Sequence, residues 1–290
     1  MALFAALVFT GNLFVTPLFL RVVWAFIIFC IAASATYLFN DVLDVKSDQL
    51  HPIKKNRPVA SGKLPVKMAL LISISFALVS FILAYNFSYI FFLLIVIYLV
   101  LQLMYSLWLK NHPTIDILII AMGFIIRVYA GAFVINAHLS VWFLLCVVSV
   151  ALFLASGKRR AELSILDKST TVTRKSLVLY KRELLNSYVT MFGNAAWLSW
   201  ALFTFFESPR ATTPVWIFLA ELSMTTAINK LLMITIPIVI YIIMRYEGLI
   251  FEGKSETPEK LLLSDRGLIV SIAIWFILIV YVLYGGISVV

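Results

Sequence analysis

Residues 20–48 read LRVVWAFIIFCIAASATYLFNDVLDVKSD, an apolar run that leads directly into a row of acidic side chains. The run at 20–39 is long enough to cross a membrane, because about 20 helical residues span the roughly 30 Å hydrocarbon core of a bilayer. The carboxylates of Asp41, Asp44 and Asp48 follow at i, i+3 and i+7, which places them on one face of a helix. Because like charges on one face repel each other, this acidic row predicts a bound cation at the end of a membrane-spanning helix.

The composition of the whole chain extends this prediction. Of the 290 residues, 63% are hydrophobic and 13% are charged, and the mean hydropathy is +1.04. A soluble domain of this length buries its core with far less apolar sequence, so we expect an all-α integral membrane protein in one domain at 1–290. The segment at 2–10 is too short to span a bilayer, so we expect a shortened first helix. About nine helices are expected, at 2–10, 20–39, 65–84, 88–109, 114–135, 139–156, 184–206, 231–246 and 267–284.

Lys and Arg residues gather in alternate connections between the expected helices. The connections 40–67, 157–182 and 254–266 are rich in them, whereas 85–87 and 136–138 contain neither. Basic loops stay on the cytoplasmic side of a membrane, so these three connections and the acidic row are expected to share the cytoplasmic face. We attribute the net charge of +9 to loop orientation and anionic partners at that face, and we predict no nucleic acid partner.

Polar and basic residues beside the acidic row complete a first candidate site. Mg²⁺ takes oxygen ligands and commonly joins one or two carboxylates to substrate phosphates, so the row predicts a Mg²⁺-pyrophosphate site. The three aspartates are the predicted metal ligands and catalytic residues, and neighbouring cations would offset the remaining phosphate charge. The alternative is a helix end whose charges are simply solvated. The candidate residues are Asn40, Asp41, Asp44, Asp48, Lys54, Lys55 and Arg57.

A second candidate cluster follows the sixth expected helix. It contains Lys158, Arg159 and Glu162, with Arg174 and Tyr180 further along the same connection. Arginine suits bidentate contacts with phosphate and lysine suits point-charge contacts, so the cluster predicts a cradle for a second phosphate. Lys158 and Glu162 also lie at i and i+4, so an intrahelical ion pair is the alternative.

Three further residues are candidates for contact with an anionic substrate. Arg127 lies in the middle of the expected helix 114–135, where exposure to lipid would cost roughly 2.5–3.5 kcal/mol. It should therefore face the protein interior, where either an acidic partner or an anionic substrate would satisfy it. Lys110 and Tyr105 precede that helix on the cytoplasmic side, and we predict a phosphate contact for Lys110.

The acidic row resembles the first Asp-rich motif of the UbiA superfamily of intramembrane prenyltransferases. The matching pattern is Asn40-Asp41-x-x-Asp44-x-x-x-Asp48, followed by RPVASG at 57–62. The expected number of helices also agrees, so the resemblance covers essentially the whole chain. It implies a UbiA-like helical bundle.

The connection after the sixth helix departs from the usual pattern of that superfamily. Typical members carry a second Asp-rich motif there, whereas this chain has Asp167 alone, with GKRRAEL at 157–163 and TRKSL at 173–177. These segments, together with YSLWLK at 105–110 and RVYAG at 127–131, resemble one branch of the superfamily. That branch comprises the polyprenyl-phosphate (decaprenyl-phosphate) phosphoribosyltransferases.

The resemblance to this branch implies a multi-pass enzyme of the bacterial inner membrane with its active site facing the cytoplasm. It implies transfer of 5-phosphoribose from 5-phosphoribosyl-1-pyrophosphate to a polyprenyl phosphate, with Mg²⁺ as cofactor. The product would supply arabinose donors for the cell envelope. Such a donor and acceptor bring three anionic groups, which a basic connection accommodates better than an acidic one. The sequence leaves open whether the protein assembles as a homo-oligomer.

Two other functions remain open from the sequence. A UbiA-type prenyltransferase that joins a prenyl pyrophosphate to an aromatic acceptor shares the first motif, but would be expected to carry the second motif as well. A polytopic anion transporter would be expected to show repeated helix breaks at Gly or Pro. The expected helices contain few such breaks apart from Pro237.

Overall fold

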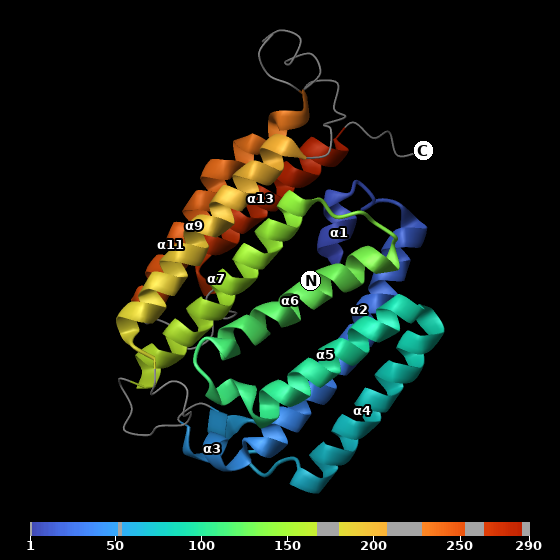
Figure 1. The fold of residues 1–290 in the computed structure, drawn as a ribbon, viewed down its shortest axis with the longest axis vertical. Helices are drawn as coiled ribbons and strands as arrows, with labels where there is room; N and C mark the ends of the chain where they lie inside the picture. Colours follow the sequence, from blue (N-terminus) through green and yellow to red (C-terminus); the bar gives the residue numbers. More distant parts are fainter. Residues whose placement is uncertain (1, 52–53, 167–179, 208–227, 253–263, 286–290) are drawn as a thin grey trace. The chain divides into compact units, whose positions relative to one another are not determined.

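The computed structural model describes residues 2–51, 54–166, 180–207, 228–252 and 264–285. Every regular element in these ranges is a helix, and none of them contains a strand (Figure 1). The expected all-α fold is therefore confirmed. The elements are α1 (Phe4–Phe9), α2 (Thr16–Leu43), α3 (Val45–Leu50), η1 (Lys54–Asn56), α4 (Val66–Phe87), α5 (Tyr89–Leu107), η2 (Leu109–Asn111), α6 (Ile115–Val134), α7 (Val141–Leu166), α9 (Arg182–Phe206), η3 (Ile228–Thr235), α11 (Ile236–Phe251) and α13 (Arg266–Tyr284).

The contacts divide the chain into two compact units. Helices α2 to α6, coloured blue to green in Figure 1, belong to unit 1, and helices α7 to α13, coloured yellow-green to red, belong to unit 2. The single domain expected at 1–290 stays a prediction. Unit 1 consists of Met1–Ala5, Thr16–Ala137 and Leu166–Lys181, and unit 2 of Ala6–Val15, His138–Ile165 and Arg182–Val290.

Eight helices in the described ranges are long and apolar enough to cross a membrane, so the chain is a multi-pass membrane protein. The expected count of about nine included the N-terminal segment. That segment forms α1, whose six residues rise only about 9 Å, far less than the thickness of a bilayer core. Helices α2 and α4 pack through small side chains, and the Ser73 hydroxyl donates to the Ala35 carbonyl at 2.8 Å. Small residues let membrane helices approach closely. Close packing matters here because the hydrophobic effect does not favour association of helices that are already in lipid.

The acidic row lies at the junction of α2 and α3, and the helix was expected to end earlier. Helix α2 continues to Leu43 and therefore includes Asp41, while Asp44 (φ −92°, ψ 3°) separates it from α3. The helical hydrogen bonds nevertheless continue: Asp44 N donates to Asn40 O at 2.9 Å, and Asp48 N donates to Asp44 O at 2.8 Å. The three carboxylates therefore keep nearly the spacing of a single helix.

Helix α7 is ten residues longer at its C-terminal end than the helix expected at 139–156. The apolar run ends near Ser156, but α7 continues through the basic segment to Leu166. The end of an apolar run marks where the bilayer ends, whereas Lys, Arg, Ala, Glu and Leu all favour continued helix. The second candidate cluster is consequently helical.

The helix expected at 231–246 is replaced by two elements. Residues Ile228–Thr235 form the 3₁₀ helix η3, and α11 begins at Ile236 with Pro237 in its first turn. Proline has no N–H and collides with the carbonyl four residues earlier, so an α-helix begins at this position more readily than it passes through it. The Trp200 indole donates to Thr235 Oγ1 at 3.0 Å and holds the junction against α9.

Asp265 caps the last helix. Its carboxylate accepts a hydrogen bond from Leu268 N at 2.9 Å and another from Arg245 Nη2 at 2.8 Å. The hydrogen bond from Arg245 is the main cause that lowers the pKa of the Asp265 carboxyl, and the Leu268 N–H acts in the same direction. The start of α13 is thus joined to α11 in unit 2.

Gly131 in α6 allows the backbone of Leu3 to approach closely within unit 1. A Cβ atom at this position would overlap the backbone of Leu3, whose side chain is buried. Because backbone cannot move aside as a flexible side chain can, Gly131→Ala should lower the free energy of unfolding by about 1–3 kcal/mol. Thermal unfolding of the detergent-purified variant measures the loss.

Gly248→Ala in α11 is the matched control, because a Cβ atom there would meet no heavy atom within 4 Å. Replacement of an unhindered helical glycine should be neutral or stabilise by up to about 1 kcal/mol. Equal melting temperatures for the two variants would show that the approach of Leu3 to Gly131 is not tight.

Candidate active site

Arg57 joins two of the three carboxylates of the acidic row. Its Nη1 atom donates to Asp41 Oδ1 at 2.8 Å and to Asp48 Oδ2 at 2.9 Å. The Asp48 side chain is buried, and that of Asp41 is largely so, whereas 37% of the Arg57 side chain is exposed. Two carboxylate oxygens of unit 1 thus converge on one position that favours a cation.

Lys110 contacts the third carboxylate. Its Nζ atom lies 2.5 Å from Asp44 Oδ1 and 3.5 Å from Asn40 Oδ1. Lys110 belongs to η2 and is buried, and a charge-assisted contact is strong where little water competes. The structure therefore places Lys110, which was predicted as a phosphate contact, within the acidic row itself.

A compact turn after α3 positions Arg57. The Lys54 N–H donates to His51 Nδ1 at 3.3 Å, and the Arg57 carbonyl accepts from Ser61 N at 2.8 Å. Gly62 has φ +79°, a conformation that favours glycine, and allows the chain to reverse before α4. The other two predicted cations of this segment lie in η1, where Lys54 is half-buried and Lys55 is exposed.

Mg²⁺ is the metal that the resemblance implies, and it requires oxygen ligands such as carboxylates. Among the described residues, no three His, Cys, Asp or Glu side chains form a group that could hold a metal ion. A Mg²⁺ that also binds substrate phosphates requires only one or two carboxylates, and Asp41 and Asp48 supply two converging oxygens. The residues therefore fit a Mg²⁺ shared with a phosphorylated substrate, with Asp44 beside it and held by Lys110.

Arg127 is satisfied by aromatic and carbonyl groups inside unit 1. Its guanidinium donates to Tyr98 Oη at 2.9 Å and to Gly123 O at 2.8 Å. Its Cζ atom lies 5.0 Å from the ring centroid of Tyr98 and 5.4 Å from that of Phe29, within the range of cation–π attraction. The prediction that Arg127 faces the interior is confirmed, and its contacts there are rings, a phenol and a carbonyl. Tyr105 is half-buried in the last turn of α5.

Tyr180 is buried against the start of α6. Its hydroxyl accepts a hydrogen bond from Thr114 N at 2.5 Å and donates one to Asp116 Oδ1 at 2.6 Å. Asp116 is completely buried, and no local sequence pattern indicates that it pairs with a tyrosine 64 residues away. Arg174, the other candidate in this connection, lies outside the described residues.

The second candidate cluster lies on α7 in unit 2. Arg159 is fully buried and donates to Glu162, and Lys158 is half-buried. Arg160, which was not a predicted site residue, donates to Asn186 Oδ1 at 2.5 Å and lies over the ring of Phe251 at 5.5 Å. The structure records an ion pair of Glu162 with Arg159, at i and i+3.

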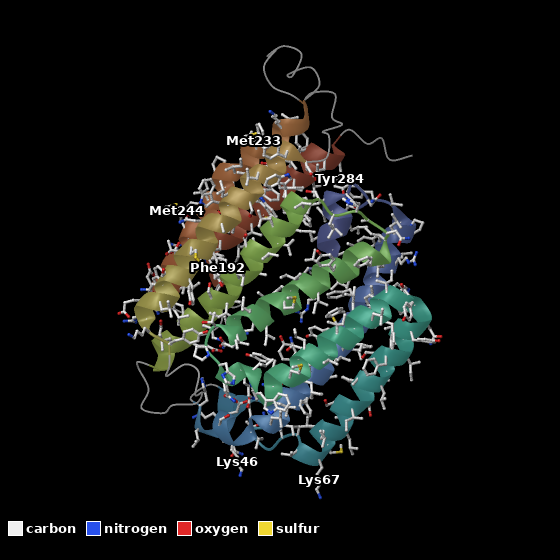
Figure 2. The ribbon with its side chains drawn as sticks, in the orientation of Figure 1. Lys46, Lys67, Phe192, Met233, Met244 and Tyr284 are labelled. Carbon is white, nitrogen blue, oxygen red and sulfur yellow. The ribbon has the colours of Figure 1, made fainter. Side chains whose placement is uncertain are left out.

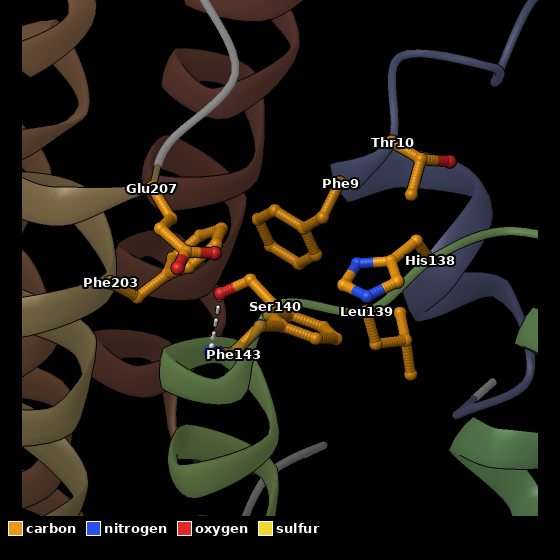
Figure 3. A pocket seen from close by; sticks show the side chains of 8 residues that line it. All are labelled: Phe9, Thr10, His138, Leu139, Ser140, Phe143, Phe203 and Glu207. Atoms are coloured by element: carbon orange, nitrogen blue, oxygen red, sulfur yellow. Dashed lines mark hydrogen bonds between the residues drawn. The ribbon is translucent and has the colours of Figure 1, made fainter.

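Unit 2 also contains an open hollow of about 250 Å³, shown in Figure 3, near the start of α7 and the end of α9. Its base is formed by the rings of Phe9, Phe143 and Phe203, whose centroids lie 5.0–5.8 Å apart. Among the described residues, the charged or titratable side chains that line it are His138 and Glu207, and neither is a lysine or arginine of the kind that binds phosphate. The basic cluster of unit 2 is on the later part of α7.

Exposed lysines mark the end of unit 1 that carries the acidic row. Figure 2 shows Lys46 and Lys67 pointing away from the helices at the end where α3 lies. Lys63 and Lys55 are exposed on the same connection. The cytoplasmic orientation of this end stays a prediction from the loop charges.

Comparison with known proteins places this arrangement in a family. The model of the UbiA prenyltransferase family matches residues 1–232. A decaprenyl-phosphate phosphoribosyltransferase from Corynebacterium glutamicum is 36% identical over 266 residues, which cover 90% of this chain and 75% of the relative. The enzyme of the same name from Mycolicibacterium smegmatis is 34% identical over 251 residues, covering 87% and 76%.

Solved structures agree in fold. A UbiA homologue from Aeropyrum pernix K1 superposes with a TM-score of 0.65 at 15% identity, covering 95% of this chain and 96% of that one. A UbiA homologue from Archaeoglobus fulgidus bound to DMAPP and Mg²⁺ gives a TM-score of 0.63 at 18% identity, with 93% and 88% covered. Together with the relatives above, these matches show that the chain belongs to the UbiA prenyltransferase family, in the branch of the decaprenyl-phosphate phosphoribosyltransferases.

Proposed function

We propose that this protein transfers 5-phosphoribose from 5-phosphoribosyl-1-pyrophosphate to a polyprenyl phosphate at the cytoplasmic face of a bacterial inner membrane. The observation that carries the proposal is the grouping of three carboxylates with Arg57 and Lys110 in a member of this branch. Carboxylates for a metal and cations for phosphate oxygens are what a pyrophosphate donor requires. The product would supply arabinose donors for the cell envelope.

In this proposal the acidic row binds the pyrophosphate end of the donor. Asp41 and Asp48 would hold Mg²⁺ with Asp44 beside them, and the UbiA homologue bound to DMAPP and Mg²⁺ supports use of this metal. When bound, Mg²⁺ supplies stabilisation of the charge that develops on the leaving pyrophosphate. Arg57 and Lys110 lie close enough to these carboxylates to contact the phosphate oxygens of the same group.

The transfer itself exchanges one bond at C1 of the ribose. The bond from C1 to the pyrophosphate oxygen breaks, a bond from C1 to an oxygen of the lipid phosphate forms, and pyrophosphate leaves with the electron pair. The lipid phosphate is already anionic at neutral pH, so this step requires no general base. Accordingly, we assign to the side chains of this site the tasks of binding and orienting the donor and of balancing its charge.

The remaining phosphates require further cations. We propose Lys158 and Arg159, the latter oriented by Glu162, and Arg174 as contacts for the donor 5-phosphate or the acceptor phosphate. Four further residues that the sequence predicted as substrate contacts remain proposals: Lys54, Lys55, Tyr105 and Arg127.

The proposal is tested by incubating the purified protein in nanodiscs with labelled phosphoribosyl pyrophosphate and polyprenyl phosphate. We expect label in the lipid phase only when both Mg²⁺ and the lipid phosphate are present. Label that stays in the aqueous phase, with prenylation of an aromatic acceptor from a prenyl pyrophosphate, would instead support the prenyltransferase alternative. Uptake of anions into proteoliposomes without lipid product would support a transporter.

A further inference from the structure

The buried hydroxyl of Tyr180 connects two parts of the start of α6. It accepts from the Thr114 backbone N–H at 2.5 Å and donates to Asp116 Oδ1 at 2.6 Å. Tyr180 is 5% exposed and Asp116 is 0% exposed, so water offers little replacement for either bond. One hydroxyl group therefore satisfies a backbone donor and a buried carboxylate at the same turn.

Thr114 is the residue that most needs such a restraint. Its φ of 69° and ψ of −48° lie outside the regions that a β-branched residue normally adopts. Strained backbone of this kind persists only where surrounding contacts fix it. The hydrogen bond from Thr114 N to the Tyr180 hydroxyl is one of these contacts, so its loss would allow the turn to relax.

The same turn carries Lys110. Its 3₁₀ helix, η2, is linked forward by hydrogen bonds from His112 N to Leu109 O and from Asp116 N to His112 O, both at 3.2 Å. A shift of the backbone at Thr114 therefore moves the short segment that holds Lys110. The Lys110 ammonium is set 2.5 Å from Asp44 Oδ1, so a small displacement would change this contact.

We infer that Tyr180 is a positioning residue, which acts through Thr114 and η2 to hold Lys110 against Asp44 at the pyrophosphate end of the donor site. Tyr180 itself groups with unit 1. Its two hydrogen bonds thus connect Tyr180 to the turn that carries Lys110. The inference rests on the proposed function, because that function identifies the ligand of Lys110 as pyrophosphate.

Tyr180→Phe tests the inference, because it removes the hydroxyl and keeps the ring. We expect the KM for phosphoribosyl pyrophosphate to rise about tenfold, since small misplacements of a binding group weaken an oriented contact strongly. The KM for polyprenyl phosphate should change less than about twofold. Isothermal titration with inorganic pyrophosphate and Mg²⁺ should show the same weakening without any turnover.

Tyr284→Phe is the matched control, because Tyr284 is also 5% exposed and its hydroxyl likewise bonds backbone atoms, at Val8 O and Leu13 N. Tyr284 lies in unit 2, so the Tyr284→Phe variant should have altered thermal stability but no increase in the KM for phosphoribosyl pyrophosphate. A Lys110→Met background separates positioning from general stability: there, Tyr180→Phe should add less than about a twofold further loss in pyrophosphate affinity.

Additive effects in this double-mutant cycle, or an unchanged donor KM in Tyr180→Phe, would overturn the inference. If Tyr180→Phe does not fold, the cycle is run with Tyr180→Phe combined with Thr114→Gly, because glycine adopts a positive φ without strain. Wild-type protein that makes no phosphoribosyl lipid would refute the proposed function. An active wild type with a normal Tyr180→Phe variant would refute only the positioning role.

Discussion

Asp41→Asn is expected to reduce phosphoribosyl transfer by about a thousandfold, because loss of several kcal/mol of charge stabilisation slows a reaction tenfold per 1.4 kcal/mol. The amide keeps the size of the side chain but removes the charge that converges with Asp48 on one cation position. Lipid-phase label and pyrophosphate release, measured at saturating Mg²⁺, give the rate. The variant should insert into the membrane and unfold near the wild-type temperature.

Glu247→Gln is the control for loss of a carboxylate elsewhere. Glu247 lies in unit 2, is half-buried, and accepts a hydrogen bond from Thr190 at 2.5 Å, which an amide oxygen can also accept. Its turnover should remain within about twofold of wild type, as expected for a polar substitution outside the special sites of a protein. Normal turnover in purified Asp41→Asn would remove the acidic row from the active site.

Arg57→Gln should affect the metal and the donor in opposite directions. The Arg57 guanidinium and a divalent cation need the same oxygens of Asp41 and Asp48, so they compete for them. Without Arg57, Mg²⁺ alone should bind about tenfold more tightly, which corresponds to one charge-assisted hydrogen bond of about 1.5 kcal/mol. Phosphoribosyl pyrophosphate at saturating Mg²⁺ should bind about 10–100-fold more weakly, because Arg57 no longer contacts its phosphates.

Isothermal titration of the purified protein measures both affinities, and Lys67→Gln is the matched control. Lys67 is exposed at the same end of unit 1, so its removal tests the general effect of one positive charge there. Exposed charges are screened by salt, so the control should change both affinities little. A fall in Mg²⁺ affinity in Arg57→Gln would mean that the arginine and the metal do not share these carboxylates.

The sequence predicted most of the membrane helices to within a turn, because a span of apolar residues is a local property. The largest error was the end of α7, where the charged segment after Ser156 continues the helix beyond the apolar run. The other was η3, where Pro237 begins a new helix inside what hydropathy alone presents as one span. In both cases hydropathy indicates which residues lie in the membrane, whereas backbone hydrogen bonding determines where a helix begins and ends.

The sequence predicted the residues of the candidate site better than it predicted which of them contact one another. Asp41, Asp44 and Asp48 lie on neighbouring turns as their spacing required, and Arg57 reaches Asp41 and Asp48 from a turn nine residues after Asp48. Tyr180 was predicted as a phosphate contact, and the structure places its hydroxyl in hydrogen bonds with Thr114 and Asp116. No local pattern marks a partner for Asp116, which resembles an ordinary acid in the first turn of a helix.

The sequence by itself determined that this chain is a helical membrane protein with an acidic row at a basic end, because transfer of apolar side chains into lipid and the 3.6-residue period act over neighbouring residues. Only the tertiary structure decided which cation meets which acid. Lys110 lies 66 residues from Asp44, and their contact depends on how η2 is placed beside the end of α2. That placement results from packing among α2, α5 and α6, which no short segment of the chain encodes.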